Sequence, residues 1–266
     1  MPLTAEQQTT EHSTFLALAR AAADGFRVLS MSADGGSSDD IGGAICWYST
    51  SYVPVFNGAS ILEPDLINQA TLSAIENYFR PRGRPFSVMT LDALVPDARK
   101  RIHPYGYFEY DAMPAMWLTG EPADQPPGSS ELWITQVTSP VTLAAFRRIL
   151  SEVFHLSITE VDLVLGEKTL EIPHVRHYLG WLNNTPVSTA SLVLSDDVAG
   201  VWNVGTMTEY RHRGVAASLM RHILSDARDL GCDKSMLLAS NDGQPLYERL
   251  GYKTLSNVRV FVPEQD

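Results

Sequence analysis

One segment constrains the fold of this sequence more than any other, because its apolar side chains recur at helical spacing over four turns. They are Ala216, Leu219, Met220, Ile223, Leu224, Ala227 and Leu230. Gly231 follows, and glycine is the preferred residue just after the end of a helix. The pattern predicts an amphipathic helix over residues 216–230 whose apolar face covers a core. Apolar β runs at 201–207 and 235–239 flank it, which is the strand, helix, strand order of an α/β domain.

The order continues on both sides of that helix. The spacing of apolar residues predicts helices at 140–154 and 244–250 and strands at 132–137, 177–182, 187–194 and 252–262. The polar residues Asn183 and Asn184 separate two of these strands, as in a hairpin. From 132 onward we therefore expect strand, helix, three strands, helix, strand, helix and strand.

The upstream half ends in a similar order. Predicted strands lie at 26–31, 43–48, 53–61, 86–90 and 107–118, with helices at 65–79 and 96–102. A Gly-Tyr pair opens the last strand of each half, at Gly106 and at Gly251. Such a repeat predicts two copies of one fold, and the alternative is a chance similarity between two α/β modules.

A break in composition separates the halves. Residues 120–130 are rich in proline, glycine and small polar residues, which cannot continue a helix or a central strand. We therefore predict an N-terminal domain at 1–120, a linker at 121–130 and a C-terminal domain at 131–266.

Charge and composition exclude several classes of function. The chain has 20 basic and 31 acidic residues, a net charge of −11, which would repel a polyanion. Two cysteines are too few for a disulfide framework or a thiolate metal site, and the seven histidines form no tight ligand cluster. The first residues lack the pattern of a signal peptide, and no apolar run reaches the roughly 20 residues of a membrane span. We expect a cytoplasmic protein that binds no metal and no membrane.

The segment before the 216–230 helix has the residues of an anion site. Arg211, His212 and Arg213 precede Gly214 at the start of the helix, in an otherwise acidic chain. The first N–H groups of a helix are unpaired and lie at its positive end, and a glycine lets a pyrophosphate approach the main chain. The alternative is a solvated arginine-rich turn.

Three motifs in this half resemble those of the GNAT superfamily of N-acetyltransferases. Arg211, Gly214 and Ala216 match its Arg/Gln-x-x-Gly-x-Gly/Ala loop, a small-apolar strand precedes them at 204–206, and Leu-Tyr-x-x-Leu-Gly-Tyr follows at 246–252. The resemblance covers about residues 131–262. It implies an α/β (α+β) fold of two GNAT-like mixed-sheet domains in tandem, each a twisted sheet flanked by helices.

The resemblance also implies a binding site for a donor, acetyl-coenzyme A or another acyl-coenzyme A, without a metal. Backbone groups of Val204, Gly205 and Thr206 would pair with the pantetheine arm, as an added strand does. The pyrophosphate would lie against Arg211 and the amides of His212, Arg213, Gly214, Val215, Ala216 and Ala217. Ser240 stands where many relatives have asparagine and would hydrogen-bond the donor. Tyr247 would be the general acid that protonates the leaving thiolate; the alternative is a core tyrosine.

The general base is not visible in the sequence. Glu171, His174 and His177 are candidates, and each can equally be a surface or packing residue. Direct attack by a neutral amine needs no strong base, because positioning and water can supply the rest.

The N-terminal half lacks the phosphate loop. Its corresponding segment, 59–65, contains Glu63 and Asp65 but no arginine or glycine, and carboxylates there would repel phosphate. We expect this half to be a degenerate copy without a donor site that walls the acceptor pocket, through Trp47, Tyr48, Tyr52 or Phe56.

The leading hypothesis is transfer of an acetyl group to the amine of a small molecule. The alternatives are another donor, such as an acyl carrier protein or aminoacyl-tRNA, and a non-catalytic coenzyme A sensor or scaffold. The sequence does not identify the acceptor or the oligomeric state.

Overall fold

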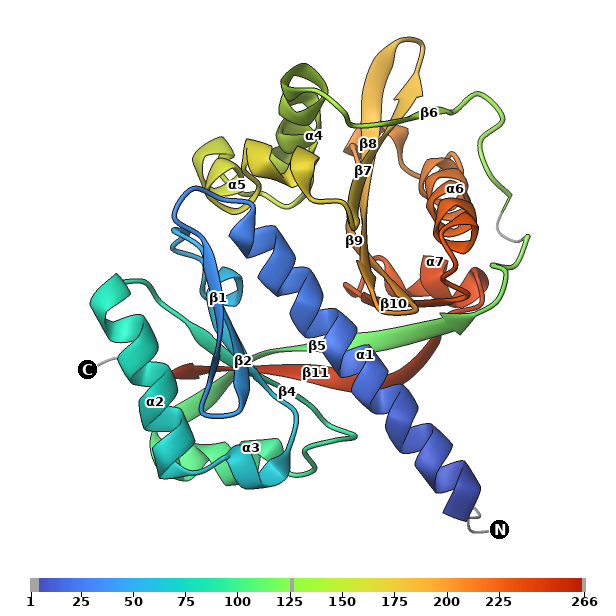
Figure 1. The fold of residues 1–266 in the computed structure, drawn as a ribbon. Helices are drawn as coiled ribbons and strands as arrows, with labels where there is room; N and C mark the ends of the chain where they lie inside the picture. Colours follow the sequence, from blue (N-terminus) through green and yellow to red (C-terminus); the bar gives the residue numbers. More distant parts are fainter. Residues whose placement is uncertain (1–4, 125–126, 265–266) are drawn as a thin grey trace.

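A single long helix opens the chain. The computed structural model describes residues 5–124 and 127–264, and its first element is α1, Ala5–Met31, which packs on strands of both halves of the chain (Figure 1). The strand predicted at 26–31 is wrong, because these residues form the last turns of α1. Leu18, Ala22 and Phe26 are buried at helical spacing. The apolar residues of the whole segment therefore follow the period of a helix, and the short apolar run at its end continues that helix.

The N-terminal half forms a mixed sheet with helices beside it. After α1 come β1 (Ser37–Ile41), β2 (Ala44–Tyr48), β3 (Gly58–Ile61), α2 (Gln69–Phe79), β4 (Ser87–Leu91), α3 (Ala98–Ile102) and β5 (Tyr107–Thr119). The strand predicted at 53–61 and the helix predicted at 65–79 both begin too early. Their first residues form short 3-10 turns, η1 (Pro54–Phe56) and η2 (Pro64–Leu66). A proline opens each turn, since its fixed φ suits the first position and it donates no N–H.

The C-terminal half follows the predicted order closely. It contains β6 (Trp133–Gln136), α4 (Pro140–Val153), β7 (Val175–Leu182), β8 (Thr185–Ser195), β9 (Val198–Thr206), α6 (Val215–Asp229), β10 (Lys234–Leu238), α7 (Gln244–Arg249) and β11 (Lys253–Pro263). A short helix, α5 (Ile158–Val164), is an addition that the sequence analysis missed. The Ser157 side chain caps it by accepting a hydrogen bond from Glu160 N.

The eleven strands found in residues 5–124 and 127–264 form one sheet, in the order β1-β2-β3-β4-β11-β5-β10-β9-β8-β7-β6. The two halves exchange their last strands: β5 of the N-terminal half lies between β10 and β11, and β11 lies between β4 and β5 (Figure 1). The strands β3–β4 and β9–β10 are parallel and the remaining pairs are antiparallel. The predicted α/β class with a mixed sheet is therefore confirmed, and the exchange makes each half complete the sheet of the other.

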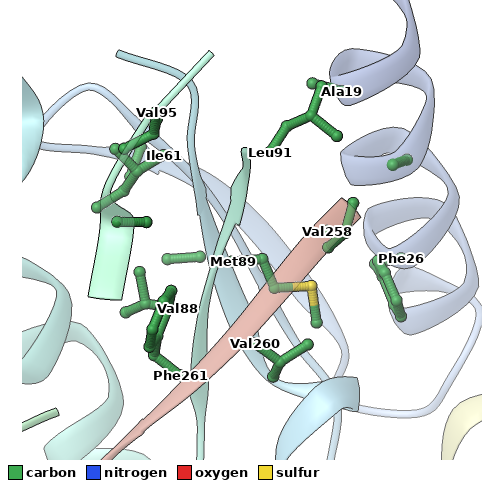
Figure 2. Packing of buried hydrophobic residues seen from close by; sticks show 14 of the residues in the cluster. Ala19, Phe26, Ile61, Val88, Met89, Leu91, Val95, Val258, Val260 and Phe261 are labelled. Atoms are coloured by element: carbon green, nitrogen blue, oxygen red, sulfur yellow. The ribbon is translucent and has the colours of Figure 1, made fainter. Parts of the chain in front are cut away.

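The core also crosses between the halves. Val258 and Val260 of β11 lie with Met89 of β4 on the side of the sheet that faces α1, and Phe261 lies with Val88 on the opposite side; all five side chains are buried (Figure 2). A second cluster lies under α6, around Leu219, Met220 and Ile223. Burying side chains of this size stabilises the fold by about 1.5–3 kcal/mol each, so separation of the halves would expose a large apolar surface.

Within residues 5–124 and 127–264, no helix combines the length and the apolar character that a membrane crossing requires. The same residues contain no group of three His, Cys, Asp or Glu side chains placed to hold a metal ion.

Candidate functional site

The sheet opens between two parallel strands of the C-terminal half. Strand β9 pairs with β10 only at Val198 to Gly200, where Gly200 lies beside Met236. Beyond this point β9 continues to Thr206 along β8, and β10 continues to Leu238 along β5. The two strands therefore diverge, and the facing backbone edges in the opening are not paired with each other. An extended ligand can hydrogen-bond such an edge as an added strand does.

A bulge in β9 lies at the start of this opening. Asn203 has a left-handed backbone with φ of 55°, and the register with β8 shifts between Thr189 and Ser191. Thr189 Oγ1 donates to the Asn203 carbonyl over 2.9 Å, and Asn203 Nδ2 donates to Ser191 Oγ over 3.1 Å. These bonds hold the bulge, which raises the local twist and directs the next residues away from β10.

Val204, Gly205 and Thr206 follow the bulge along the opening. Val204 is half-buried and lines the cavity described below, whereas Gly205 is buried. Thr206 Oγ1 is buried and has no hydrogen-bond partner among the residues that the structure describes. A buried hydroxyl without a partner costs free energy, so this atom is suited to a ligand that supplies the missing bond.

The predicted phosphate loop connects the end of β9 to α6. It runs through the 3-10 turn η6 (Thr208–Tyr210) and is tied back by Arg211, whose Nε donates to the Thr206 carbonyl over 3.1 Å. His212 and Gly214 have left-handed backbones, with φ of 61° and 74°. Arg211, His212 and Arg213 are exposed, so three side chains of basic type surround the turn.

The start of α6 is open to an anion. The helix begins at Val215 after Gly214, and no side chain caps its first N–H groups. The Val215 and Ala217 side chains are buried and anchor the first turn, while Ala216 is half-buried. Uncapped N–H groups at the positive end of a helix of this length, beside two arginines, form the kind of site that binds phosphate.

Gly214 also makes room for the segment that connects the halves. A Cβ at this position would lie 2.7 Å from both the Pro127 carbonyl oxygen and the Gly128 carbonyl carbon. Ser129 N donates to Ser218 Oγ over 2.8 Å and fixes the segment on α6. Glycine is therefore required here for its φ and for this close approach, in addition to any contact with a ligand.

A cavity of about 320 Å³ adjoins the opening between β9 and β10. Both halves of the chain line it. Its walls are Phe26, Leu29, Ser30, Val55, Phe56, Asp111, Met113, Leu150, Phe154, Leu156, Val161, Val164, Leu165, Val201, Trp202, Asn203, Val204, Leu237, Leu238, Ser240 and Tyr247. The structure thus brings three of the predicted site residues, Val204, Ser240 and Tyr247, to one cavity. The loop from Arg211 to Ala217 is not part of its wall and lies beyond the end of β9.

Tyr247 lies on α7 with a side chain that is 7% exposed. Burial raises the pKa of its phenol to about 12, so the hydroxyl is protonated at neutral pH. The ring lies against Gly243, where a Cβ would be 2.8 Å from it, and against the edge of Tyr252. Within the described part of the chain the Tyr247 hydroxyl has no hydrogen-bond partner, which leaves it available to a group in the cavity.

Ser240 has an exposed side chain at the entrance to α7. Its Oγ accepts a hydrogen bond from Gly243 N over 3.2 Å, and its carbonyl accepts from Gly243 N and Gln244 N. The hydroxyl hydrogen remains available to a ligand, while the turn itself keeps α7 in place.

The structure does not bring the three candidate bases to the cavity. His177 is buried, and its ring nitrogens lie 2.6 Å from Thr169 Oγ1 and 2.7 Å from Ser191 Oγ. Burial lowers its pKa to about 4, so it is a neutral, hydrogen-bonded core residue. Glu171 and His174 are exposed and do not line the cavity.

The cavity instead contains one carboxylate that the sequence analysis missed, Asp111 of β5. It reaches the site through the exchange of β5 into the other half of the sheet. No local motif marks Asp111, and only knowledge of the strand order could have placed it there.

The aromatic residues predicted to wall the pocket divide into two groups. Phe56 lines the cavity, whereas Trp47 is fully buried and stacks on Phe26 at 5.2 Å between ring centroids. Tyr48 and Tyr52 are not part of the cavity wall, and Tyr52 is exposed beneath the Arg84 guanidinium. The wall contributed by the N-terminal half comes from α1, η1 and β5.

The corresponding place in the N-terminal half is closed. Strand β3 pairs with β4 over its whole length, from Gly58 beside Ser87 to Ile61 beside Thr90, so these strands do not diverge. The following helix, α2, is capped by Asn68, whose Oδ1 accepts a hydrogen bond from Thr71 N over 3.0 Å. Both features that open the C-terminal half to a ligand are absent from this described segment.

The chain is similar to known proteins in part of its sequence and in its fold. Residues 143–252 match the Acetyltransferase (GNAT) family. A GCN5-related N-acetyltransferase from Kribbella flavida has a similar structure, with 18% identity, a TM-score of 0.71 and coverage of 94% of this chain and 96% of that one. A GCN5-related N-acetyltransferase from Sphaerobacter thermophilus follows with 13% identity, a TM-score of 0.59 and coverage of 87% and 78%.

A functionally unknown conserved protein from Staphylococcus epidermidis ATCC 12228 is similar over 86% of this chain and 92% of that one, with 11% identity and a TM-score of 0.60. At such identities these structures show the fold, which extends over both halves. A comparison with curated proteins finds no match. Residues 143–252, in the C-terminal half, thus match the GNAT acetyltransferase family, and the solved GCN5-related N-acetyltransferases share the fold of both halves.

Proposed function

We propose that the chain transfers an acetyl group from acetyl-coenzyme A to the amine of a small molecule, by direct attack of the amine. The observation that carries the proposal is the meeting of the β9–β10 opening with a cavity that Tyr247 lines. The opening suits an extended thioester arm, and the cavity has room for an acceptor beside it.

The residues present fit the donor. The unpaired backbone edge at 204–206 suits the amides of the pantetheine arm. In this segment the buried Thr206 Oγ1 has no hydrogen-bond partner among the described residues, so the donor can supply one. The uncapped start of α6, with Arg211 and Arg213, suits the pyrophosphate. Ser240 is a further hydrogen-bond donor at the cavity.

The chemistry needs little from the protein besides position. The amine nitrogen forms a bond to the thioester carbon while the bond from that carbon to sulfur breaks, and the nitrogen loses its proton to water. The Tyr247 hydroxyl can donate a hydrogen bond to the sulfur as negative charge develops on it. Holding the two reactants together in an apolar cavity supplies much of the acceleration in such a transfer.

We propose that the N-terminal half is a degenerate copy that binds no donor. The full pairing of β3 with β4 and the Asn68 cap on α2 support this assignment. Its role is then to wall the acceptor cavity with α1, η1 and β5. The division into domains at 1–120 and 131–266 belongs to the same proposal, with the qualification that one sheet spans both.

Two alternatives are distinguished by experiment. A donor carried by tRNA is disfavoured by the net charge of −11, and an acyl carrier protein would use the same pantetheine opening. A coenzyme A sensor would bind the donor without releasing thiol.

We place the protein in the reducing cytoplasm, in agreement with its two unpaired, buried cysteines.

The test is release of free thiol from acetyl-coenzyme A in the presence of a panel of primary amines, with mass detection of the acetylated product. The proposal expects amine-dependent thiol release and a product heavier by one acetyl group. Donor binding by calorimetry without turnover on any amine would favour the sensor, and failure to bind the donor would overturn the proposal.

A further inference from the structure

The wall of the cavity has an unusual distribution of charge. Among the lining residues that the structure describes, Asp111 is the one carboxylate, and none is a lysine, arginine or histidine. Apart from Asp111, its polar side chains are Ser30, Asn203, Ser240 and the hydroxyl and indole groups of Tyr247 and Trp202. All other lining side chains are aliphatic, Met or Phe. The cavity therefore offers a large apolar surface and a single negative charge.

The position of Asp111 follows from the exchanged strand. Strand β5 pairs with β10 up to Ala115, opposite Leu238, and Pro114 O accepts a hydrogen bond from Ala239 N. Met113 and Asp111 lie beyond that point, and both line the cavity, as expected for alternate residues on one face of a strand. Asp111 is exposed, so its carboxylate lies at the rim, where water can still reach it.

The Asp111 carboxylate is available to a cation. Its Oδ1 accepts a hydrogen bond from Ala112 N over 2.8 Å, and it makes no ion pair with any residue in the described ranges. An alkylammonium group has a pKa near 10 and is charged at neutral pH. A carboxylate at the rim attracts such a group, and an apolar wall accepts the hydrocarbon body attached to it.

The same wall excludes anions. A substrate carboxylate placed in the cavity would find no basic side chain among the lining residues and would lie near Asp111. Burying an unpaired carboxylate is costly, and a like charge adds to the cost. An amine and the corresponding amino acid, which have the same body, should therefore differ strongly as acceptors.

From this juxtaposition we infer that the acceptor is a hydrophobic primary amine without a carboxylate, and that Asp111 is the residue that recognises its ammonium group. The inference rests on the proposed function and specifies its substrate class. The cavity volume, about 320 Å³, is that of a small-molecule site and suits a body the size of one aromatic ring with a short chain. Asp111 is a specificity residue here, and water at the rim takes the proton of the bound amine.

The test compares phenethylamine with phenylalanine as acceptors, with spermidine as a polar cation, in the thiol-release assay on the full chain. We expect kcat/KM for phenethylamine to exceed the values for phenylalanine and for spermidine by at least about 30-fold. Asp111→Asn keeps the size of the side chain and removes its charge. It should raise the KM for phenethylamine about 3- to 10-fold, leave kcat within about 2-fold, and narrow the preference over phenylalanine.

A matched control is Asp40→Asn, which removes an exposed carboxylate from β1 and should change none of these values. Binding of phenethylamine to the enzyme saturated with coenzyme A, measured by calorimetry, separates recognition from turnover. Normal donor binding with equal or better use of phenylalanine or spermidine would overturn the inference and leave the proposed function standing. An unchanged preference in Asp111→Asn would remove Asp111 from recognition. Absence of donor binding would instead reject the proposed function.

Discussion

Tyr247→Phe tests how the leaving thiolate is stabilised. The substitution keeps the ring against Gly243 and Tyr252 and removes one hydroxyl that has no partner among the described residues. Burial raises the pKa of this phenol to about 12, whereas a thiol has a pKa near 8.5. At 1.36 kcal/mol for each pKa unit, complete proton transfer from the phenol to a thiolate is uphill by about 5 kcal/mol. Tyr247 should therefore act as a hydrogen-bond donor to the sulfur.

The size of the effect follows from that role. A hydrogen bond to a charged group contributes about 1.5–3 kcal/mol, which corresponds to a fall in kcat of about 10- to 150-fold. The affinity for acetyl-coenzyme A should change little, because the bond strengthens only as charge develops on sulfur. The free energy of unfolding should change by less than about 0.5 kcal/mol, since the hydroxyl has no partner to lose.

The assay is thiol release from acetyl-coenzyme A with an accepted amine, together with donor affinity by calorimetry and the melting temperature. Tyr252→Phe is the matched control: its buried hydroxyl lies 2.6 Å from Ser235 Oγ and outside the cavity wall. That control should lose about 1–3 kcal/mol of stability and keep its kcat. Wild-type kcat in Tyr247→Phe, with folding intact, would refute the role of Tyr247.

Two further predictions concern the structure around the site. The pKa of His177 is lowered by burial from 6.5 to about 4, so its contribution to stability is present above pH 6.5 and is lost as the pH falls from 6.5 to 4, by about 3 kcal/mol. Denaturant titrations at pH 7 and pH 4 should show a smaller loss for His177→Gln, and equal losses would contradict the argument. In α1, a Cβ at Gly25 would lie 2.1 Å from the Trp202 indole, so Gly25→Ala should lower the free energy of unfolding by about 1–3 kcal/mol. Unchanged stability in a denaturant titration would mean that α1 does not pack against β9 in this way.

Local periodicity predicted most elements of the C-terminal half. The apolar stripe from Leu219 to Ala227 is longer than two turns and is compatible only with a helix. The sequence therefore predicted α6 to within one residue at each end. At the start of the chain the same reasoning failed, because the short run at 26–31 is compatible with a strand or with a helix end. Only the burial of Leu18 and Ala22 at helical spacing shows that the run continues α1.

The site was predictable only where it is local in sequence. The loop at Arg211 and Gly214 and the tyrosine at 247 lie within short motifs, and the structure brings Tyr247 to the cavity with Val204 and Ser240. Asp111 reaches the same cavity because β5 crosses into the other half of the sheet. This pairing of distant strands depends on the strand order of the complete sheet, and the residues around Asp111 contain no pattern that predicts it.

Calorimetry with acetyl-coenzyme A decides whether the donor binds in the C-terminal half alone. We expect one site per chain, and a weaker affinity by at least about 10-fold in Arg211→Glu, because a negative side chain replaces a positive one at the uncapped start of α6. Arg249→Glu, an exposed charge reversal on α7, should bind as the wild type does. Two equivalent sites per chain would show that the N-terminal half also binds the donor, and an unchanged affinity in Arg211→Glu would show that the donor does not bind at the start of α6.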